Sequence, residues 1–294
     1  MLFRSEANLY TFFLQDEMAG LISELEGIGS EHISVGAGSG EILKMGGLLA
    51  SMQEGSIVVP DPTFEDLPRY AGNNGCEVIR VPVNGQMALD LEAMANAIRS
   101  DTKLIYICNP NNPIPTIVEK NALRDFVLEV SRDRMVFVDE AYHEFVDNPD
   151  YSSMMDLVRE GHRNIIIART ASKIHGLAGL RVGFGFSHPD LAAEINRRMT
   201  GTLNIVGMRA ALASYRDKEH AAFVLRTNKE ALEITQGYFR EAGIRHIDSN
   251  ANFTFVETGH DIAEVQARFL EYNIRVGRPF PPFRNKKLFH QKHL

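Results

Sequence analysis

Short apolar runs alternate with segments of helical length through the middle of the chain, and this alternation constrains the fold more than any other feature. The runs are rich in β-branched and aromatic residues and are bounded by Gly, Pro, Asn or Asp, which predicts strands at 33–35, 57–59, 78–81, 104–108, 135–139, 165–168 and 182–186. Helix-length segments lie between several of them, at 40–53, 90–100 and 120–132. The alternation predicts an α/β fold with a mainly parallel sheet sandwiched by helices.

The pattern changes after about residue 187. Long helical stretches at 189–199 and 221–242 are followed by one alternating strand at 252–257 and a helix at 261–272. We therefore expect a domain change near residue 215. Residues 30–215 would form a large domain, and residues 1–29 with 216–294 a smaller α+β domain that includes the N-terminal segment.

Composition excludes several classes of protein. Of the 294 residues, 44% are apolar and 23% charged, which is typical of a soluble globular chain, and the net charge of −7 favours neither a nucleic-acid nor a membrane partner. The two cysteines, Cys76 and Cys108, lie far apart, so we predict no disulfide framework and no metal site. The chain shows neither a signal-peptide pattern nor a run of about 18 apolar residues, and we expect a cytoplasmic location. The basic segment 284–293 is interpreted as a solvated tail.

The segment 168–181, Ala-Arg-Thr-Ala-Ser-Lys-Ile-His-Gly-Leu-Ala-Gly-Leu-Arg, follows the apolar run that ends at 168. It places Lys173 among small and hydroxyl residues, which suits an amine held for Schiff-base chemistry with a carbonyl. Thr170, Ser172 and Arg181 are candidate donors to a phosphate on the same ligand. The alternative is a solvated loop lysine with a surface arginine.

A Gly-rich turn at 35–43 joins a predicted strand to a predicted helix. Small residues let backbone N–H groups approach a phosphate, and the start of the helix adds partial positive charge, so Ser39 and Gly40 are candidate phosphate ligands. The turn lacks a Walker lysine and is not the dinucleotide fingerprint. It could equally be a tight connection.

Two further strand ends carry polar side chains. Prolines stiffen the turn Cys-Asn-Pro-Asn-Asn-Pro at 108–113, so that an asparagine amide there could donate to a ligand, although asparagines also simply favour turns. Asp139 ends a buried strand, where a carboxylate needs a cation. Beside a pyridine ring it would keep the ring nitrogen protonated, and the alternative is a helix cap.

Taken in order, the motifs Gly-Ser-Gly-Glu, Pro-Thr-Phe, Asn-Asn-Pro, Asp-Glu-Ala-Tyr, Ser-Lys and Gly-Leu-Arg resemble those of the fold-type I (class I/II) aminotransferases that use pyridoxal 5′-phosphate (PLP). Within that family, residues 8–280 are most similar to the histidinol-phosphate aminotransferases. The resemblance implies the PLP-dependent transferase fold and transamination between a small-molecule amino donor, such as histidinol phosphate, and a 2-oxo acid such as 2-oxoglutarate. It also implies a homodimer.

The resemblance also implies roles for single residues. Lys173 would bind PLP and act as the base, with Asp139 at the pyridine nitrogen and Tyr142 as a third catalytic residue. The remaining cofactor-binding residues fall into three groups. Asn112, together with Tyr142, would donate to the phenolic oxygen of PLP; Phe64 would stack on its ring; and the phosphate would be held by Ser39, Gly40, Thr170, Ser172, Arg181 and, from the neighbouring subunit, Tyr10.

The chain departs from the family pattern at three places. Ile114-Pro115 replaces the usual Thr-Gly, and we expect this to stiffen the loop beside the cofactor. Relative to the family pattern, we expect the N-terminal arm and the last strand, with its carboxylate-binding arginine, to be shortened, and neither Arg275 nor Arg278 matches that arginine. Two alternatives therefore stay open: a PLP-dependent lyase such as a phosphoamino acid decarboxylase, or a shortened paralogue that binds PLP without turnover or serves as an interaction protein.

Overall fold

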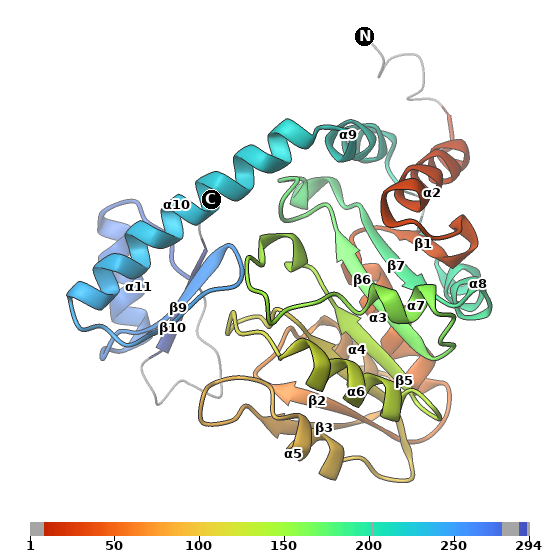
Figure 1. The fold of residues 1–294 in the computed structure, drawn as a ribbon, viewed down its shortest axis with the longest axis horizontal. Helices are drawn as coiled ribbons and strands as arrows, with labels where there is room; N and C mark the ends of the chain where they lie inside the picture. Colours follow the sequence, from red (N-terminus) through yellow and green to blue (C-terminus); the bar gives the residue numbers. More distant parts are fainter. Residues whose placement is uncertain (1–8, 202, 278–287, 293–294) are drawn as a thin grey trace.

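A mixed sheet of seven strands forms the centre of the molecule in the computed structural model, which describes residues 9–201, 203–277 and 288–292. Its strand order is β1-β7-β6-β5-β4-β2-β3 (Figure 1). The strands are β1 (Ile33–Gly36), β2 (Ser56–Asp61), β3 (Glu77–Pro82), β4 (Thr102–Cys108), β5 (Met135–Asp139), β6 (Ile165–Thr170) and β7 (Gly183–Ser187). The pairs from β3 through β6 are parallel, whereas β7 runs antiparallel to both β6 and β1. The predicted mainly parallel sheet is confirmed.

Helices cover both faces of this sheet because its strands are apolar on both sides. Along β5, for example, Val136 and Val138 join one buried cluster and Phe137 the other. One face is covered by α2 (Phe12–Glu26), α5 (Leu91–Asn96), α6 (Lys120–Val130), α7 (Met155–Arg159) and α9 (Ile205–Arg216). The other is covered by α3 (Ser39–Ser51), α4 (Asp66–Asn73) and α8 (Pro189–Arg198). None of the helices in the described ranges has the length and apolarity needed to cross a membrane.

A second, three-stranded sheet of order β10-β9-β8 lies beside the first (Figure 1). It consists of β8 (His246–Ile247), β9 (Phe253–Glu257) and β10 (Leu288–Lys292), and is accompanied by α10 (Lys218–Glu241) and α11 (Ile262–Glu271). The expected solvated tail is wrong for 288–292, because β10 pairs antiparallel with β9 and occupies an edge that would otherwise expose unpaired backbone groups. The domain division near residue 215 stays a prediction.

The two sheets are joined through the segment that departs from the family pattern. Ile114 is fully buried against Phe255 of β9, with Val83 and Met87 packed around the pair. In addition, the backbone N–H and the side-chain amide of Asn250 both donate to the carbonyl oxygen of Pro115, at 3.0 and 3.2 Å. Ile114 and Pro115 therefore lie in the contact between the sheets.

Candidate active site

The parallel strands bring their carboxyl ends, and the loops that follow them, to one edge of the central sheet. The register pairs Cys108 of β4 with Asp139 of β5, and Asp139 with Ala168 of β6. Asn112 and Lys173 lie in the loops that follow β4 and β6. The topology thus brings three of the predicted site residues, Asn112, Asp139 and Lys173, to neighbouring positions.

Asp139 is a buried carboxylate, 2% exposed. Its Oδ1 accepts from the backbone N–H of Ala141 at 3.1 Å, and its Oδ2 accepts from the hydroxyl of Tyr106 at 3.3 Å. Burial raises its pKa from 3.8 to about 6, although the bond from Ala141 and the charge of Lys173 oppose this. A carboxylate in this state gains from a nearby cation, which is what a protonated pyridine nitrogen would supply.

Tyr142 connects the other two residues. Its hydroxyl accepts from Nδ2 of Asn112 at 3.0 Å, while Nζ of Lys173 lies 4.7 Å from the centre of its ring. The edge of that ring also packs against Phe253 of β9, with 5.1 Å between ring centres. Burial raises the pKa of Tyr142 well above its ordinary value, so the phenol stays protonated and keeps a hydrogen to donate.

The predicted phosphate ligands gather at the first turn of α3. Arg181 has a left-handed backbone, φ 57°, and its guanidinium donates to the carbonyl oxygens of Ala37 and Ala178 at 3.1 and 2.9 Å. A Cβ atom at Gly38 would lie only 2.2 Å from Nη2 of Arg181, so the glycine is required for this approach. Ser39 and Gly40 open the helix directly after it.

Thr170 and Ser172 complete this donor set. The hydroxyl of Thr170 donates to the hydroxyl of Ser172 at 2.8 Å and accepts from its backbone N–H at 3.1 Å. Together with the start of a 13-residue helix and a guanidinium, these hydroxyls form a donor set suited to a phosphate dianion. The residues present therefore fit a group that carries a phosphate at one end and a basic ring nitrogen at the other.

Two side chains that the sequence did not identify support the site. Asn111, fully buried, accepts from the hydroxyl of Thr63 and donates to the carbonyl oxygen of Pro62, both at 3.0 Å. It thereby fixes the turn that carries Phe64, whose half-buried ring packs against a core cluster. Tyr106 is the second, since it donates to Asp139. In the sequence the only sign of Asn111 was its place in the Asn-Asn-Pro motif.

Tyr10 is not brought to the other site residues within this chain. Its side chain is 75% exposed and its ring stacks on that of Phe12, with 6.0 Å between centres. Arg275 is exposed, and Arg278 lies outside the described residues. The predicted role of Tyr10 in a neighbouring subunit stays a prediction.

Comparisons with known proteins all indicate the same family. The model of the family "Aminotransferase class I and II" matches residues 3–282. The histidinol-phosphate aminotransferase of Moorella thermoacetica is 36% identical over 266 residues, covering 90% of this chain and 68% of the relative. That of Akkermansia muciniphila is 32% identical over 253 residues, covering 86% and 69%.

Solved structures agree with this. A structure from Erwinia carotovora atroseptica, provisionally assigned as a histidinol-phosphate aminotransferase, has a TM-score of 0.92 and 27% identity, covering 98% of this chain and 84% of that one. The histidinol-phosphate aminotransferase from Sinorhizobium meliloti, solved in complex with pyridoxal-5′-phosphate, has a TM-score of 0.87 and 22% identity, covering 97% and 78%. At that identity the second likeness shows the shared fold.

Proposed function

From the premise that the chain belongs to the class I and II aminotransferases, we propose that its amino donor is histidinol phosphate and its acceptor a 2-oxo acid such as 2-oxoglutarate. The chain is a PLP-dependent aminotransferase. One observation supports placing the active site at this edge of the sheet. The Lys173 amine lies above the ring of Tyr142, and the hydroxyl of Tyr142 is held by Asn112. The 36% identity to a histidinol-phosphate aminotransferase supports the choice of donor.

When bound, PLP supplies a carbonyl that reacts with amines and a ring that accepts electrons. We propose that Asp139 faces its ring nitrogen and Phe64 its ring face. The phosphate would be held by Ser39, Gly40, Thr170, Ser172 and Arg181. Asp139 would be ionised in that complex, because the proton on the ring nitrogen offsets the cost of burying the carboxylate.

Lys173 is the base that this geometry offers. Its Nζ lies over the face of the Tyr142 ring, which keeps the amine on one side of the site. From there Nζ would accept a proton from the substrate carbon that bears the amine and return it elsewhere on the same ligand. Tyr142, protonated and held by Asn112, would donate to the phenolic oxygen of PLP.

We also propose a homodimer in the cytoplasm, without nucleic-acid or membrane partners. Support for the dimer comes from the apolar side chains around the start of α2, since Leu9, Phe12 and Phe13 are 51%, 64% and 42% exposed. Adjacent exposed side chains of this size are typical of a surface that another protein covers.

A half-reaction screen tests the function. Purified protein loaded with PLP is mixed with histidinol phosphate, phenylalanine or glutamate, and the visible absorbance of the cofactor is followed. We expect histidinol phosphate to change the spectrum fastest, and 2-oxoglutarate to restore it. A spectrum that no donor changes would indicate a PLP-binding protein without turnover, and release of carbon dioxide would indicate a lyase.

A further inference from the structure

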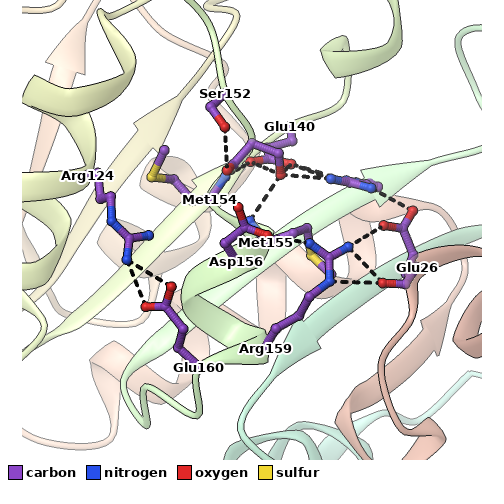
Figure 2. Close-up of polar contacts among 11 residues, drawn as sticks. Glu26, Arg124, Glu140, Ser152, Met154, Met155, Asp156, Arg159 and Glu160 are labelled. Atoms are coloured by element: carbon purple, nitrogen blue, oxygen red, sulfur yellow. Dashed lines mark hydrogen bonds and ion pairs between the residues drawn. The ribbon is translucent and has the colours of Figure 1, made fainter.

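A buried carboxylate that the mechanism does not use follows Asp139 directly. The side chain of Glu140 is 1% exposed. Its oxygens accept from the backbone N–H of Met154 at 2.7 Å (Figure 2) and from the hydroxyl of Ser153. Its Oε2 also accepts from Nε and Nη2 of Arg169 at 3.1 and 2.9 Å. The carboxylate is therefore fully hydrogen-bonded, and its main partner comes from another strand.

That partner, Arg169, stands four residues before Lys173 in the chain and on the far side of the sheet from the site. It follows Ile165 and Ile167 on the face that α2 covers, whereas alternation turns Thr170 to the opposite face. Burial by itself disfavours its cation, but the carboxylates of Glu140 and Glu26 raise its pKa above the ordinary value, so the guanidinium stays charged.

The same guanidinium reaches helix α2. Nη1 of Arg169 donates to Oε1 of Glu26 at 2.6 Å, and Glu26 is the last residue of that helix. The carbonyl oxygen of Glu26 in turn accepts from Nε and Nη2 of Arg159, at 2.9 and 2.7 Å, which fixes the end of α2 to α7 (Figure 2). A continuous set of charged hydrogen bonds therefore runs from the residue after Asp139 to α2.

We propose that the Glu140–Arg169–Glu26 relay is a positioning device for transamination, which fixes the end of β6, and with it Lys173, relative to Asp139. The inference rests on the proposed roles of Lys173 and Asp139. The backbone N–H of Glu140 already donates to the carbonyl oxygen of Ala168 at 2.9 Å, and the relay adds a rigid side-chain link between the same two strand ends. The guanidinium of Arg169 donates from Nε and Nη2 to Oε2 of Glu140 and from Nη1 to Glu26, and this planar set of donors restricts it to one geometry, whereas buried ion pairs as such contribute little net stability.

The test uses PLP-loaded protein and four variants: Glu26→Ala, Glu26→Gln, Arg169→Lys and, as a matched control, Arg124→Ala. The Arg124–Glu160 pair, 2.8 Å apart on the same side of the molecule, does not contact the relay (Figure 2). The measurements are kcat and KM, the visible circular dichroism of bound PLP, which reports its orientation, and the melting temperature without cofactor.

We expect Glu26→Ala and Arg169→Lys to lower kcat by roughly 10- to 100-fold with little change in KM, because small misplacement of reacting groups has effects of that size. Their circular dichroism band should change. A lysine cannot reach both carboxylates with a rigid fork, whereas Glu26→Gln keeps an oxygen for Arg169 and should retain most of kcat. Arg124→Ala should match the unsubstituted protein.

Unchanged kcat and circular dichroism in Glu26→Ala and Arg169→Lys, with only a lower melting temperature, would overturn the proposal and leave the relay a purely structural element. If Arg169→Lys does not fold, Glu26→Ala decides, since Glu26 lies at the outer end of the relay. Failure of the proposed function is distinguishable, because the unsubstituted protein itself would then fail to exchange amino groups.

Discussion

The side-chain amide of Asn112 donates to the hydroxyl of Tyr142 at 3.0 Å and so joins the loops that follow β4 and β5. The two side chains are only 9% and 2% exposed, so water does not easily replace either partner. Because a buried polar group that loses its partner keeps the cost of desolvation, the two residues should act as a unit.

A double-mutant cycle tests that coupling. We expect Asn112→Ala and Tyr142→Phe each to lower the unfolding free energy. The double variant should lose less than the sum of the two single losses, and the difference, the coupling free energy, should be about 0.5–1.5 kcal/mol. Urea unfolding of the cofactor-free protein measures it. Fully additive effects would show that the hydrogen bond contributes nothing beyond the separate side chains.

Lys173→Ala should abolish the covalent link to PLP and slow transamination by at least about 10²–10⁴-fold, since the variant loses the nucleophile as well as the base. Reduction with borohydride should attach the cofactor permanently to Lys173 in the unsubstituted protein, and peptide mass analysis should find it there. The variant should carry no cofactor at position 173. Lys44→Ala, at an exposed position on α3, serves as the control. Near-normal turnover of Lys173→Ala would refute the assignment.

Asp139 predicts a pH dependence of stability. Burial raises its pKa from 3.8 to about 6, so the folded cofactor-free protein binds the proton more tightly than the unfolded chain. Its stability should therefore fall as the pH rises from about 4 to about 6. Asp139→Asn removes the free-energy cost of burying the ionised carboxylate, which corresponds to about 3 kcal/mol near neutral pH. Urea unfolding at about pH 4 and about pH 7 measures this, and the unfolding free energy of the variant should exceed that of the unsubstituted protein only at the higher pH.

The same substitution should have the opposite effect on activity. Asp139→Asn keeps the phosphate ligands, so the variant should still bind PLP, but a neutral amide does not stabilise a protonated ring nitrogen. We expect most of kcat to be lost at saturating PLP. Bound cofactor with unchanged kcat would show that Asp139 serves only the structure.

The strands of the central sheet were predictable because their β-branched runs end at turn residues, but two features of the fold were not. The antiparallel direction of β7 leaves no trace in an apolar pattern. Only the connection at 171–182 hinted at it, since it carries no α-helix. Helix α2 was not predicted, although Leu14, Met18 and Ile22 repeat every four residues and all three are buried.

In the candidate active site, too, some residues could be predicted from the sequence and others could not. Strand ends indicated Asp139 and Lys173, because each stands out chemically at the end of an apolar run. The resemblance gave a role to Asn112 and none to Asn111, and the local sequence around the two asparagines shows no difference that would have indicated that Asn111 holds the Thr63 turn while Asn112 holds Tyr142. Arg169 and Glu140 stand 29 positions apart, and only the register of β5 and β6 makes them partners.

Ile114 predicts a stability effect at the contact between the two sheets. Its side chain is fully buried against Phe255, so Ile114→Ala should lower the unfolding free energy by about 2–4 kcal/mol. Ile234→Ala, at a residue 75% exposed on α10, should change it by less than about 0.5 kcal/mol. Urea unfolding of both variants measures the difference. Equal effects would mean that Ile114 does not anchor the second sheet.

Tyr10 predicts how the active site is completed. Because its ring is 75% exposed in the single chain, a contact with a phosphate would have to be made in a neighbouring subunit across a two-fold axis. Tyr10→Phe should then weaken PLP binding by the value of one hydrogen bond to a charged group, about 1.5–3 kcal/mol at most. Phe12→Ala, which removes an exposed neighbour but no hydroxyl, should weaken the dimer rather than the cofactor site within the dimer. Sedimentation of the unsubstituted protein as a monomer with full PLP occupancy, or equal PLP affinity in Tyr10→Phe, would contradict this arrangement.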